Sequence, residues 1–185
     1  NKAMTEILNL TEKLSDSKTI FVGNIVTVLI DTVTLPNGQS ATREVVRHPG
    51  AVCILATTPE DQVILVNQYR HPCGKEVLEV PAGKLDVQGE QPEQCAFREL
   101  SEETPYTARG MELIQGFYTA PGFCDEYMYL YRAHGLKMNS TAQADADEFV
   151  QTVMLSKAEA KQAIREQRIV DAKTLIALQH WLLEE

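Results

Sequence analysis

The sequence predicts an α/β fold in which a mixed β-sheet lies between helices. Runs rich in β-branched residues stand before and after one acidic helical segment, and two further amphipathic helices close the chain. The chain has 185 residues, of which 44% are hydrophobic, so it is long enough to bury a full core.

The N-terminal part of the chain predicts a small antiparallel β layer. Residues 4–14 fit either a short helix or a loose arm. Residues 19–35 are rich in Ile, Val and Thr, which favour a strand, and Pro36-Asn37-Gly38 is a turn signal. Residues 40–47 are expected to form the returning strand of a hairpin. Pro49-Gly50 then separates this layer from the chain that follows.

The remaining elements follow from apolar runs, turn signals and helix caps. Strands are expected at residues 51–57, 63–69, 76–80, 111–118, 127–134 and 149–155. Ser156 and Glu159 form a capping box that opens a helix to about Gln167. Asp171 caps a second helix that runs through Leu183.

One helical turn is unusually acidic, because the stretch from Arg98 to Glu103 reads Arg-Glu-Leu-Ser-Glu-Glu. Residues three and four apart share a helix face, so Glu99, Glu102 and Glu103 project the same way. Like charges at this spacing repel one another. A hard divalent cation such as Mg²⁺ or Mn²⁺ would compensate, because it prefers oxygen ligands. The alternative is an acidic helix face that is simply solvated.

The surroundings of this turn resemble the Nudix box. That pattern reads glycine, five residues, glutamate, seven residues, and then Arg-Glu-aliphatic-any-Glu-Glu-any-Gly-aliphatic, and Glu90 and Arg98 have its spacing. Three positions depart from it. Six residues rather than five separate Gly83 from Glu90, Pro105 stands where the family has glycine, and Tyr106 replaces the closing aliphatic residue.

The resemblance implies the α/β/α Nudix sandwich and hydrolysis of a pyrophosphate bond with Mg²⁺ or Mn²⁺. It implies that Glu99, Glu103 and the backbone carbonyl of Ala82 bind the metal, with Glu90 as a more peripheral ligand or supporting group. Glu102 would be a third ligand or would hold a metal-bound water, which makes it a candidate catalytic residue. Cations neutralise phosphate oxygens and lower the pKa of bound water.

Features outside the box resemble the ADP-ribose pyrophosphatase branch of the family. Pro121 begins a Pro-Gly loop that ends in a glutamate, and Gln68-Tyr69-Arg70 resembles a segment whose arginine contacts a substrate phosphate. Glu79 opens a Glu-x-Pro-Ala-Gly segment, and Arg43-Glu44 resembles a pair that meets adenine. The implied substrate-binding residues are Arg43, Glu44, Arg70, Glu79, Pro121, Gly122 and Glu126.

Each of these residues also has a plain structural interpretation. Pro121 and Gly122 can form an ordinary turn, and Arg70 can be a solvated side chain at a strand end. Glu79 can be a buried carboxylate at a sheet edge, and Arg43-Glu44 can be part of a cross-strand ion pair. The sequence leaves these alternatives open.

The branch can use a glutamate from a late acidic loop to activate the attacking water. The candidates are Asp145, Asp147 and Glu148, and we choose Glu148 because it lies in Asp-Glu-Phe before a strand. The branch often has a second glutamate three residues further on, where this chain has Gln151. A solvated acidic loop is the alternative.

The composition limits the classes of binding partner and indicates the cellular compartment that we expect. The net charge of -9 argues against a broad basic surface for nucleic acid. Four cysteines without a C-x-x-C pair are typical of reduced thiols in a cytoplasmic protein. No apolar run approaches the roughly 20 residues that span a membrane, and no signal peptide is visible.

The resemblance also implies a homodimer. We expect residues 1–48 to form a dimerisation and substrate-contact layer and residues 49–185 to form the Nudix domain. The predicted function is metal-dependent hydrolysis of the pyrophosphate bond of ADP-ribose, which gives AMP and ribose 5-phosphate, or of a closely related nucleoside diphosphate sugar. The alternatives are hydrolysis of another nucleotide, such as a damaged dNTP, and a catalytically silent Nudix domain that binds a nucleotide.

Overall fold

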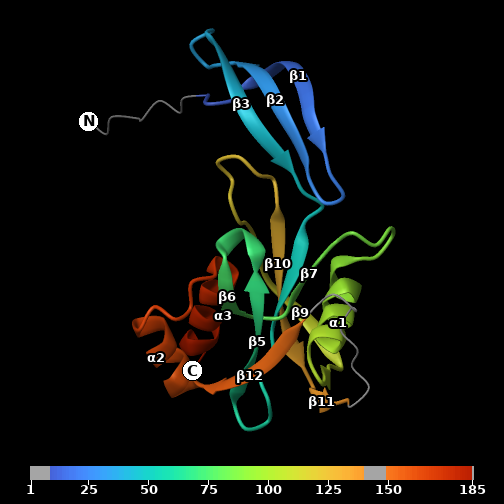
Figure 1. Cartoon of the computed structure of the whole chain (residues 1–185), viewed down its shortest axis with the longest axis vertical. Helices are drawn as coiled ribbons and strands as arrows, with labels where there is room; N and C mark the ends of the chain where they lie inside the picture. The colour runs from blue at the N-terminus through green and yellow to red at the C-terminus, as the bar shows by residue number, and fades with distance from the viewer. Residues whose placement is uncertain (1–8, 140–148, 185) are drawn as a thin grey trace, which may run out of the picture. The chain divides into compact units, whose positions relative to one another are not determined.

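The computed structural model describes residues 9–139 and 149–184, and Figure 1 shows the order of its elements. The chain divides into two compact units, which are described separately. One comprises Asn1–His48 with Ala120–Glu126, and the other comprises Pro49–Thr119 with Tyr127–Glu185. Within the described residues, no helix has the length and apolar character needed to cross a lipid bilayer.

The first unit contains a three-stranded antiparallel sheet. Its strands, in spatial order, are β1 (Lys13–Val22), β2 (Thr27–Thr34) and β3 (Ser40–Arg47). The turn between β2 and β3 falls at the predicted Pro-Asn-Gly signal, where Gly38 has a φ of 83° that favours glycine.

The prediction of a two-stranded hairpin was wrong. The stretch 19–35, expected as one strand, is divided at Gly23, whose N–H donates to the carbonyl of Val26 at 2.8 Å and closes a tight turn. The strand before that turn begins at Lys13, so the end of the segment expected to be a short helix or arm belongs to β1. The other residues of that segment up to position 8 lie outside the described residues.

The loop of the first unit, Ala120–Glu126, adds to the end of β3. The N–H of Val46 donates to the carbonyl of Phe123 at 2.7 Å, and the N–H of Asp125 donates to the carbonyl of Val46 at 3.1 Å. The carboxylate of Asp125 also binds Arg47 at 3.1 Å and accepts from the N–H of His48 at 2.8 Å. These contacts hold the loop against the strand.

The second unit contains nine strands and three α-helices among the residues that the structure describes. One sheet has the order β7 (Ala82–Lys84), β4 (Ala51–Leu55), β10 (Tyr127–His134) and β9 (Gly110–Tyr118). A second has the order β12 (Val150–Ser156), β5 (Gln62–Arg70) and β6 (Lys75–Glu79), and β11 (Lys137–Met138) pairs with β8 (Tyr106–Thr107). A 3₁₀ turn, His71–Cys73, connects β5 to β6.

The larger sheet is mixed, as predicted. Strands β10 and β4 are parallel, whereas β10 with β9 and β4 with β7 are antiparallel. Every residue of β4 is buried, which is typical of a strand covered on both faces. Its alternate side chains enter two separate core clusters, with Cys53 and Leu55 in one and Val52 and Ile54 in the other.

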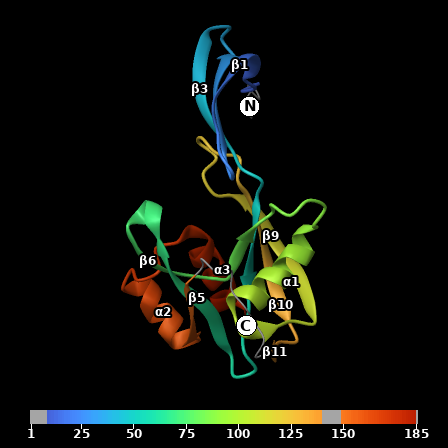
Figure 2. The same ribbon diagram turned by 45° about the vertical axis from the view of Figure 1, so that its right-hand side comes forward.

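Helices cover the two faces of this strand. Helix α1 (Pro92–Glu103) supplies Cys95, Ala96 and Leu100 to the cluster that contains Val52. Helices α2 (Lys157–Arg165) and α3 (Ala172–Leu183) supply the opposite cluster, where Trp181 is fully buried. Figure 1 and Figure 2 both show α1 on one side of the unit and the other two helices across from it. The predicted α/β/α arrangement is therefore confirmed.

The terminal helices begin where their caps were predicted. The hydroxyl of Ser156 accepts from the N–H of Glu159 at 3.3 Å, and a carboxylate oxygen of Asp171 accepts from the N–H of Thr174 at 3.1 Å. Both caps satisfy N–H groups that the first helical turn leaves without intrahelical partners.

Candidate active site

Helix α1 carries the acidic turn and fixes its direction. Pro92 opens the helix, and the N–H of Gln91 donates to the Gln94 side chain at 3.0 Å. Leu100 is fully buried, which holds the neighbouring turn against the sheet. Glu99 and Glu103 are consequently drawn inward, with only 9% and 6% of their surfaces exposed.

Strand β7 approaches this turn closely. The N–H of Ala82 donates to Oε2 of Glu103 at 3.0 Å. A Cβ atom placed on Gly83 would lie 1.9 Å from Cδ of Glu99, so the glycine leaves the space that this carboxylate occupies. The first glycine of the box is thus required by packing against Glu99.

The guanidinium of Arg98 gathers the other carboxylates of the box. Its Nε and Nη2 atoms donate to the two oxygens of Glu90 at 2.8 and 2.9 Å. Its Nη1 atom donates to Glu99 at 2.8 Å and to Glu102 at 2.9 Å. The hydrogen bonds with Arg98 lower the pKa of Glu90, and those with Glu90 raise the pKa of Arg98. Arg98 therefore binds three carboxylates of its own chain, and its Nη2 atom also contacts Sγ of Cys95 at 3.6 Å.

The extra residue before Glu90 does not break this pairing. The N–H of Glu90 donates to the carbonyl of Val87 at 3.2 Å, and Gly89 has a φ of 81°, a left-handed conformation that favours glycine. The insertion is therefore contained in a tight turn that still presents Glu90 to Arg98.

The chemistry of this group suits a hard cation. The carboxylates of Glu90, Glu99 and Glu102 face one guanidinium, so their negative charge exceeds its positive charge. Carboxylate and carbonyl oxygens are the ligands that Mg²⁺ and Mn²⁺ prefer. Within residues 9–139 and 149–184, however, no group of three or more His, Cys, Asp or Glu side chains is arranged to hold a metal ion. In this arrangement Glu99 binds Arg98 and Glu103 binds the N–H of Ala82 instead.

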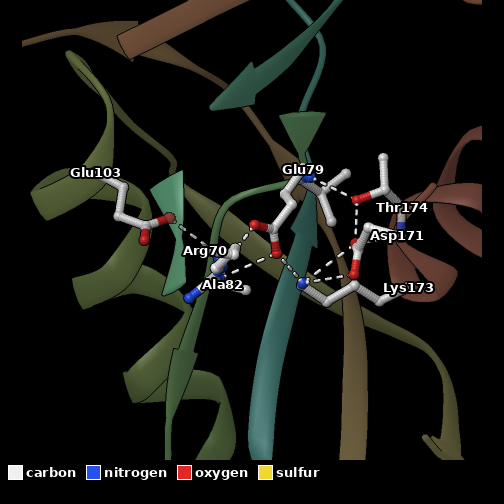
Figure 3. Close-up of polar contacts among 8 residues, drawn as sticks. Arg70, Glu79, Ala82, Glu103, Asp171, Lys173 and Thr174 are labelled. Carbon is white, nitrogen blue, oxygen red and sulfur yellow. Dashed lines mark hydrogen bonds and ion pairs between the residues drawn. The ribbon is translucent and has the colours of Figure 1, made fainter. Parts of the chain in front are cut away.

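A second charged group lies beside the acidic turn in the same unit (Figure 3). Arg70, at the end of β5, donates through Nε and Nη2 to both oxygens of Glu79 at 2.7 and 3.0 Å. The hydrogen bonds with Glu79 are the main cause of the raised pKa of Arg70, and the negative charge of Glu103 contributes. The Arg70 side chain is 41% exposed, whereas that of Glu79 is 3% exposed. Of the two interpretations of Glu79, the structure shows the buried carboxylate, and its binding of substrate stays a prediction.

The remaining predicted residues belong to the first unit or lie outside the described residues. The guanidinium of Arg43 binds Glu12 at 2.5 Å and not a cross-strand partner. Glu44 is exposed and stands opposite Ile30 in the β2–β3 ladder. Glu148, the predicted base, and the alternatives Asp145 and Asp147 lie outside the described residues.

The predicted Pro-Gly loop is an exposed turn in the first unit. The N–H of Cys124 donates to the carbonyl of Ala120 at 2.9 Å, which closes the turn around Pro121 and Gly122. Glu126 is half-buried at its end. Contact of these residues with a substrate stays a prediction.

Sequence reasoning missed Lys173, the residue that holds Glu79 from the side opposite Arg70. Lys173 is 8% exposed, and its Nζ atom donates to Oε1 of Glu79 at 2.5 Å and to Asp171 at 3.1 Å. One signal was present. A lysine in the first turn of a helix opposes the helix dipole, which favours negative charge there.

Comparison with known proteins is consistent with this geometry. The family model described as "NUDIX domain" matches residues 46–177. The chain is 49% identical over 175 residues to a "Methanol dehydrogenase activator" of Bacillus methanolicus, covering 94% of each chain. It is 41% identical over 178 residues to an "ADP-ribose pyrophosphatase" of Bacillus subtilis (strain 168), covering 96% of each.

A solved structure titled "Crystal structure of ADP compounds hydrolase" has a TM-score of 0.80 to this chain. The match covers 94% of this chain and 96% of that one, at 22% sequence identity. At this level of identity the likeness supports the fold, and it agrees with the mixed sheet and helices described above.

Proposed function

Because the chain belongs to the Nudix family, we propose that it is a hydrolase that cleaves the pyrophosphate bond of ADP-ribose, or of a closely related nucleoside diphosphate sugar. The products from ADP-ribose would be AMP and ribose 5-phosphate. The observation that carries this proposal is the pair of buried carboxylates, Glu99 and Glu103, which pack against Gly83 and Ala82. The name of the Bacillus subtilis relative supports the choice of substrate.

The proposed reaction depends on Mg²⁺ or Mn²⁺, which would neutralise the phosphate oxygens and lower the pKa of a bound water. Glu99, Glu103 and the carbonyl of Ala82 would hold the cation, with Glu90 as a peripheral ligand or support. Arg98 keeps Glu90, Glu99 and Glu102 in place through the bonds described above. The carboxylate of Glu103 is held separately, by the N–H of Ala82.

The other residues would orient the substrate and accept a proton from the attacking water. The guanidinium of Arg70, whose side chain is partly exposed, would bind a phosphate of the diphosphate, because a planar guanidinium matches phosphate oxygens. Glu102 would hold the attacking water, and Glu148 would accept its proton as the general base. Arg43, Glu44, Glu79, Pro121, Gly122 and Glu126 are the further predicted contacts with the nucleotide and the ribose.

A substrate panel tests this proposal. ADP-ribose, a nucleotide sugar such as GDP-mannose, and oxidised dNTPs are incubated with Mg²⁺ or Mn²⁺, and products are identified by chromatography. Glu103→Gln is run in parallel, with Glu93→Gln as matched control, because Glu93 is an exposed glutamate of the same helix. We expect AMP and ribose 5-phosphate from ADP-ribose, a loss of at least about 100-fold with Glu103→Gln, and wild-type rates with Glu93→Gln. Dominant dNTP turnover would overturn the substrate assignment.

A second candidate function is activation of a methanol dehydrogenase, which is what the name of the Bacillus methanolicus relative states of that protein. The observation that favours it is the 49% identity over nearly the whole of both chains. The test measures methanol dehydrogenase turnover with and without this chain, using wild type and Glu103→Gln. Stimulation by wild type alone would connect activation to the hydrolase site, and stimulation by both would indicate a separate binding role.

A catalytically silent, nucleotide-binding domain is the remaining alternative. It predicts no turnover of any substrate in the panel, together with micromolar nucleotide binding that Glu103→Gln leaves unchanged. Isothermal titration calorimetry distinguishes this outcome from hydrolysis.

We also propose that the protein acts as a cytoplasmic homodimer and that residues 1–48 form the contact between subunits. Large apolar side chains are exposed on the three-stranded layer, including Leu14 at 63%, Phe21 at 56% and Val22 at 71%. Exposed apolar surface of this kind is typical of interaction sites. The free thiols of all four cysteines support a reducing compartment. A monomeric mass by light scattering would overturn the dimer.

A further inference from the structure

A chain of alternating charges runs from Arg70 through the buried Glu79 and Lys173 to Asp171 (Figure 3). Glu79 receives Arg70 on one side and the Lys173 ammonium on the other, and the ammonium also binds Asp171. Two cations and two anions therefore alternate, with no net charge. Burial raises the pKa of Glu79, but its bonds with Arg70 and Lys173 outweigh burial and leave it lowered. The carboxylate is thus ionised and held by both cations.

Burying Lys173 at the start of a helix would destabilise the fold if its ammonium had no acidic partners. Burying an ammonium is unfavourable without paired charges, and the start of a helix disfavours positive charge. Asp171 and Glu79 offset both effects, and they raise the pKa of Lys173 although burial lowers it. An exposed lysine at this position would need neither partner.

The first turn of α3 also holds the backbone that leads into β7, the strand that contacts the acidic turn. The hydroxyl of Thr174 accepts from the N–H of Val80 at 2.9 Å and donates to Asp171 at 2.5 Å. Val80 lies between Glu79 and Ala82, whose N–H binds Glu103. The first turn of α3 therefore holds the segment that joins the two charged groups of the site.

We propose that Lys173 is a positioning residue that sets the orientation of Arg70 through Glu79, so that the remaining donors of the Arg70 guanidinium face the substrate's diphosphate. The two bonds to Glu79 use Nε and Nη2, and a guanidinium has five donors in a fixed fork. Lys173 donates to Oε1 of Glu79, the oxygen that also accepts from Nη2 of Arg70, so it restrains the carboxylate against which that fork is aligned. This inference rests on the proposed hydrolysis of a nucleoside diphosphate sugar.

Kinetics of three variants test it with ADP-ribose and Mg²⁺. Lys173→Met removes the charge and keeps the length of the side chain, and Lys173→Arg keeps the charge. Lys161→Met is the matched control, because Lys161 is an exposed lysine on α2. We expect Lys173→Met to raise KM about tenfold with kcat within about threefold of wild type, and Lys173→Arg to restore most of the affinity. The control should have wild-type KM and kcat.

A double-mutant cycle separates positioning from general structural damage. If Lys173 acts through Arg70, then Lys173→Met should change KM by less than about twofold when Arg70 is already alanine. The same tenfold rise in both backgrounds would overturn the proposal, as would a fall in kcat with KM unchanged. Should Lys173→Met fail to fold by circular dichroism, Asp171→Asn with Lys173→Met removes the pair together, and asparagine retains the helix cap.

The positioning role of Lys173 can be tested separately if the proposed hydrolase function is wrong. If wild type cleaves no member of the substrate panel, the cycle is repeated by calorimetry with ADP in the absence of metal. Weaker ADP binding by Lys173→Met in the wild-type background, and no further weakening in the Arg70→Ala background, would support the positioning role. Equal weakening in both backgrounds would overturn it.

Discussion

The close approach of Gly83 to Glu99 allows a quantitative test of the acidic turn. In Gly83→Ala, the new Cβ atom would lie 1.9 Å from Cδ and 2.0 Å from Oε1 of Glu99, whereas ordinary contact begins at 3.4 Å. The carboxyl group must therefore retreat by about 1.5 Å. Misplacing a catalytic group by about 1 Å can cost about 100-fold in rate. We expect kcat/KM for ADP-ribose to fall at least about 100-fold, and overpacking to lower the unfolding free energy by about 1–3 kcal/mol.

Gly110→Ala is the matched control for this substitution. A Cβ atom at Gly110 would have only the Cβ of His134 within reach, at 4.0 Å. This variant should therefore keep wild-type kcat/KM and a wild-type urea midpoint. Steady-state kinetics and urea unfolding followed by circular dichroism measure both quantities. A folded Gly83→Ala enzyme with kcat/KM within about threefold of wild type would refute the reasoning, because Glu99 could then leave its place without loss.

Three further predictions concern stability and reactivity. Leu100→Ala should lower the unfolding free energy by about 2–5 kcal/mol in urea titrations, because this leucine is fully buried beneath α1. Glu79→Gln should be destabilising at neutral pH. The pKa of Glu79 is lowered from 4.5, so its contribution is present above that pH and is lost as pH falls through the lower folded value. The difference between wild type and Glu79→Gln in thermal unfolding should therefore narrow below pH 4.5. Iodoacetamide followed by mass spectrometry should label exposed Cys73 in the native protein. It should spare Cys53 and Cys95, because burial raises the pKa of both thiols to about 12.

The parts of the structure that could be predicted from sequence are those fixed by local spacing. The acidic turn depends on residues three and four apart on one helix, and its direction follows from the buried Leu100. The caps at Ser156 and Asp171 involve residues within three positions of each other, and both were found where expected.

The parts that could not be predicted depend on contacts between distant segments. Lys173 and Glu79 are 94 residues apart, so no local pattern reveals that the lysine is buried against that carboxylate. The need for glycine at position 83 likewise arises from packing against Glu99 on another element. The division of residues 19–35 into two strands was missed for a different reason. Gly23 and its tight turn lie within a long run of β-branched residues, and this composition predicted one continuous strand.

The departures from the family pattern at Pro105 and Tyr106 are explained by a different helix end. Thr104 has an extended backbone, with φ of -135°, which is the conformation that a following proline favours. Its N–H and its hydroxyl both donate to the carbonyl of Leu100, at 3.1 and 2.6 Å. The last turn of α1 is thereby capped without the left-handed residue that glycine supplies.

This cap also gives Tyr106 a structural role. The tyrosine is 7% exposed and packs in the cluster that contains Leu100, so it fills the place of the family's aliphatic residue with a larger ring. Positions 105 and 106 both lie after the carboxylates in the sequence. The hydrogen bonds that replace the glycine cap are accepted by the carbonyl of Leu100, a residue on the buried face of the helix. The inward direction of Glu99 and Glu103 depends on that buried face and on β7. We infer that the substitutions at positions 105 and 106 leave the acidic turn competent for the proposed chemistry.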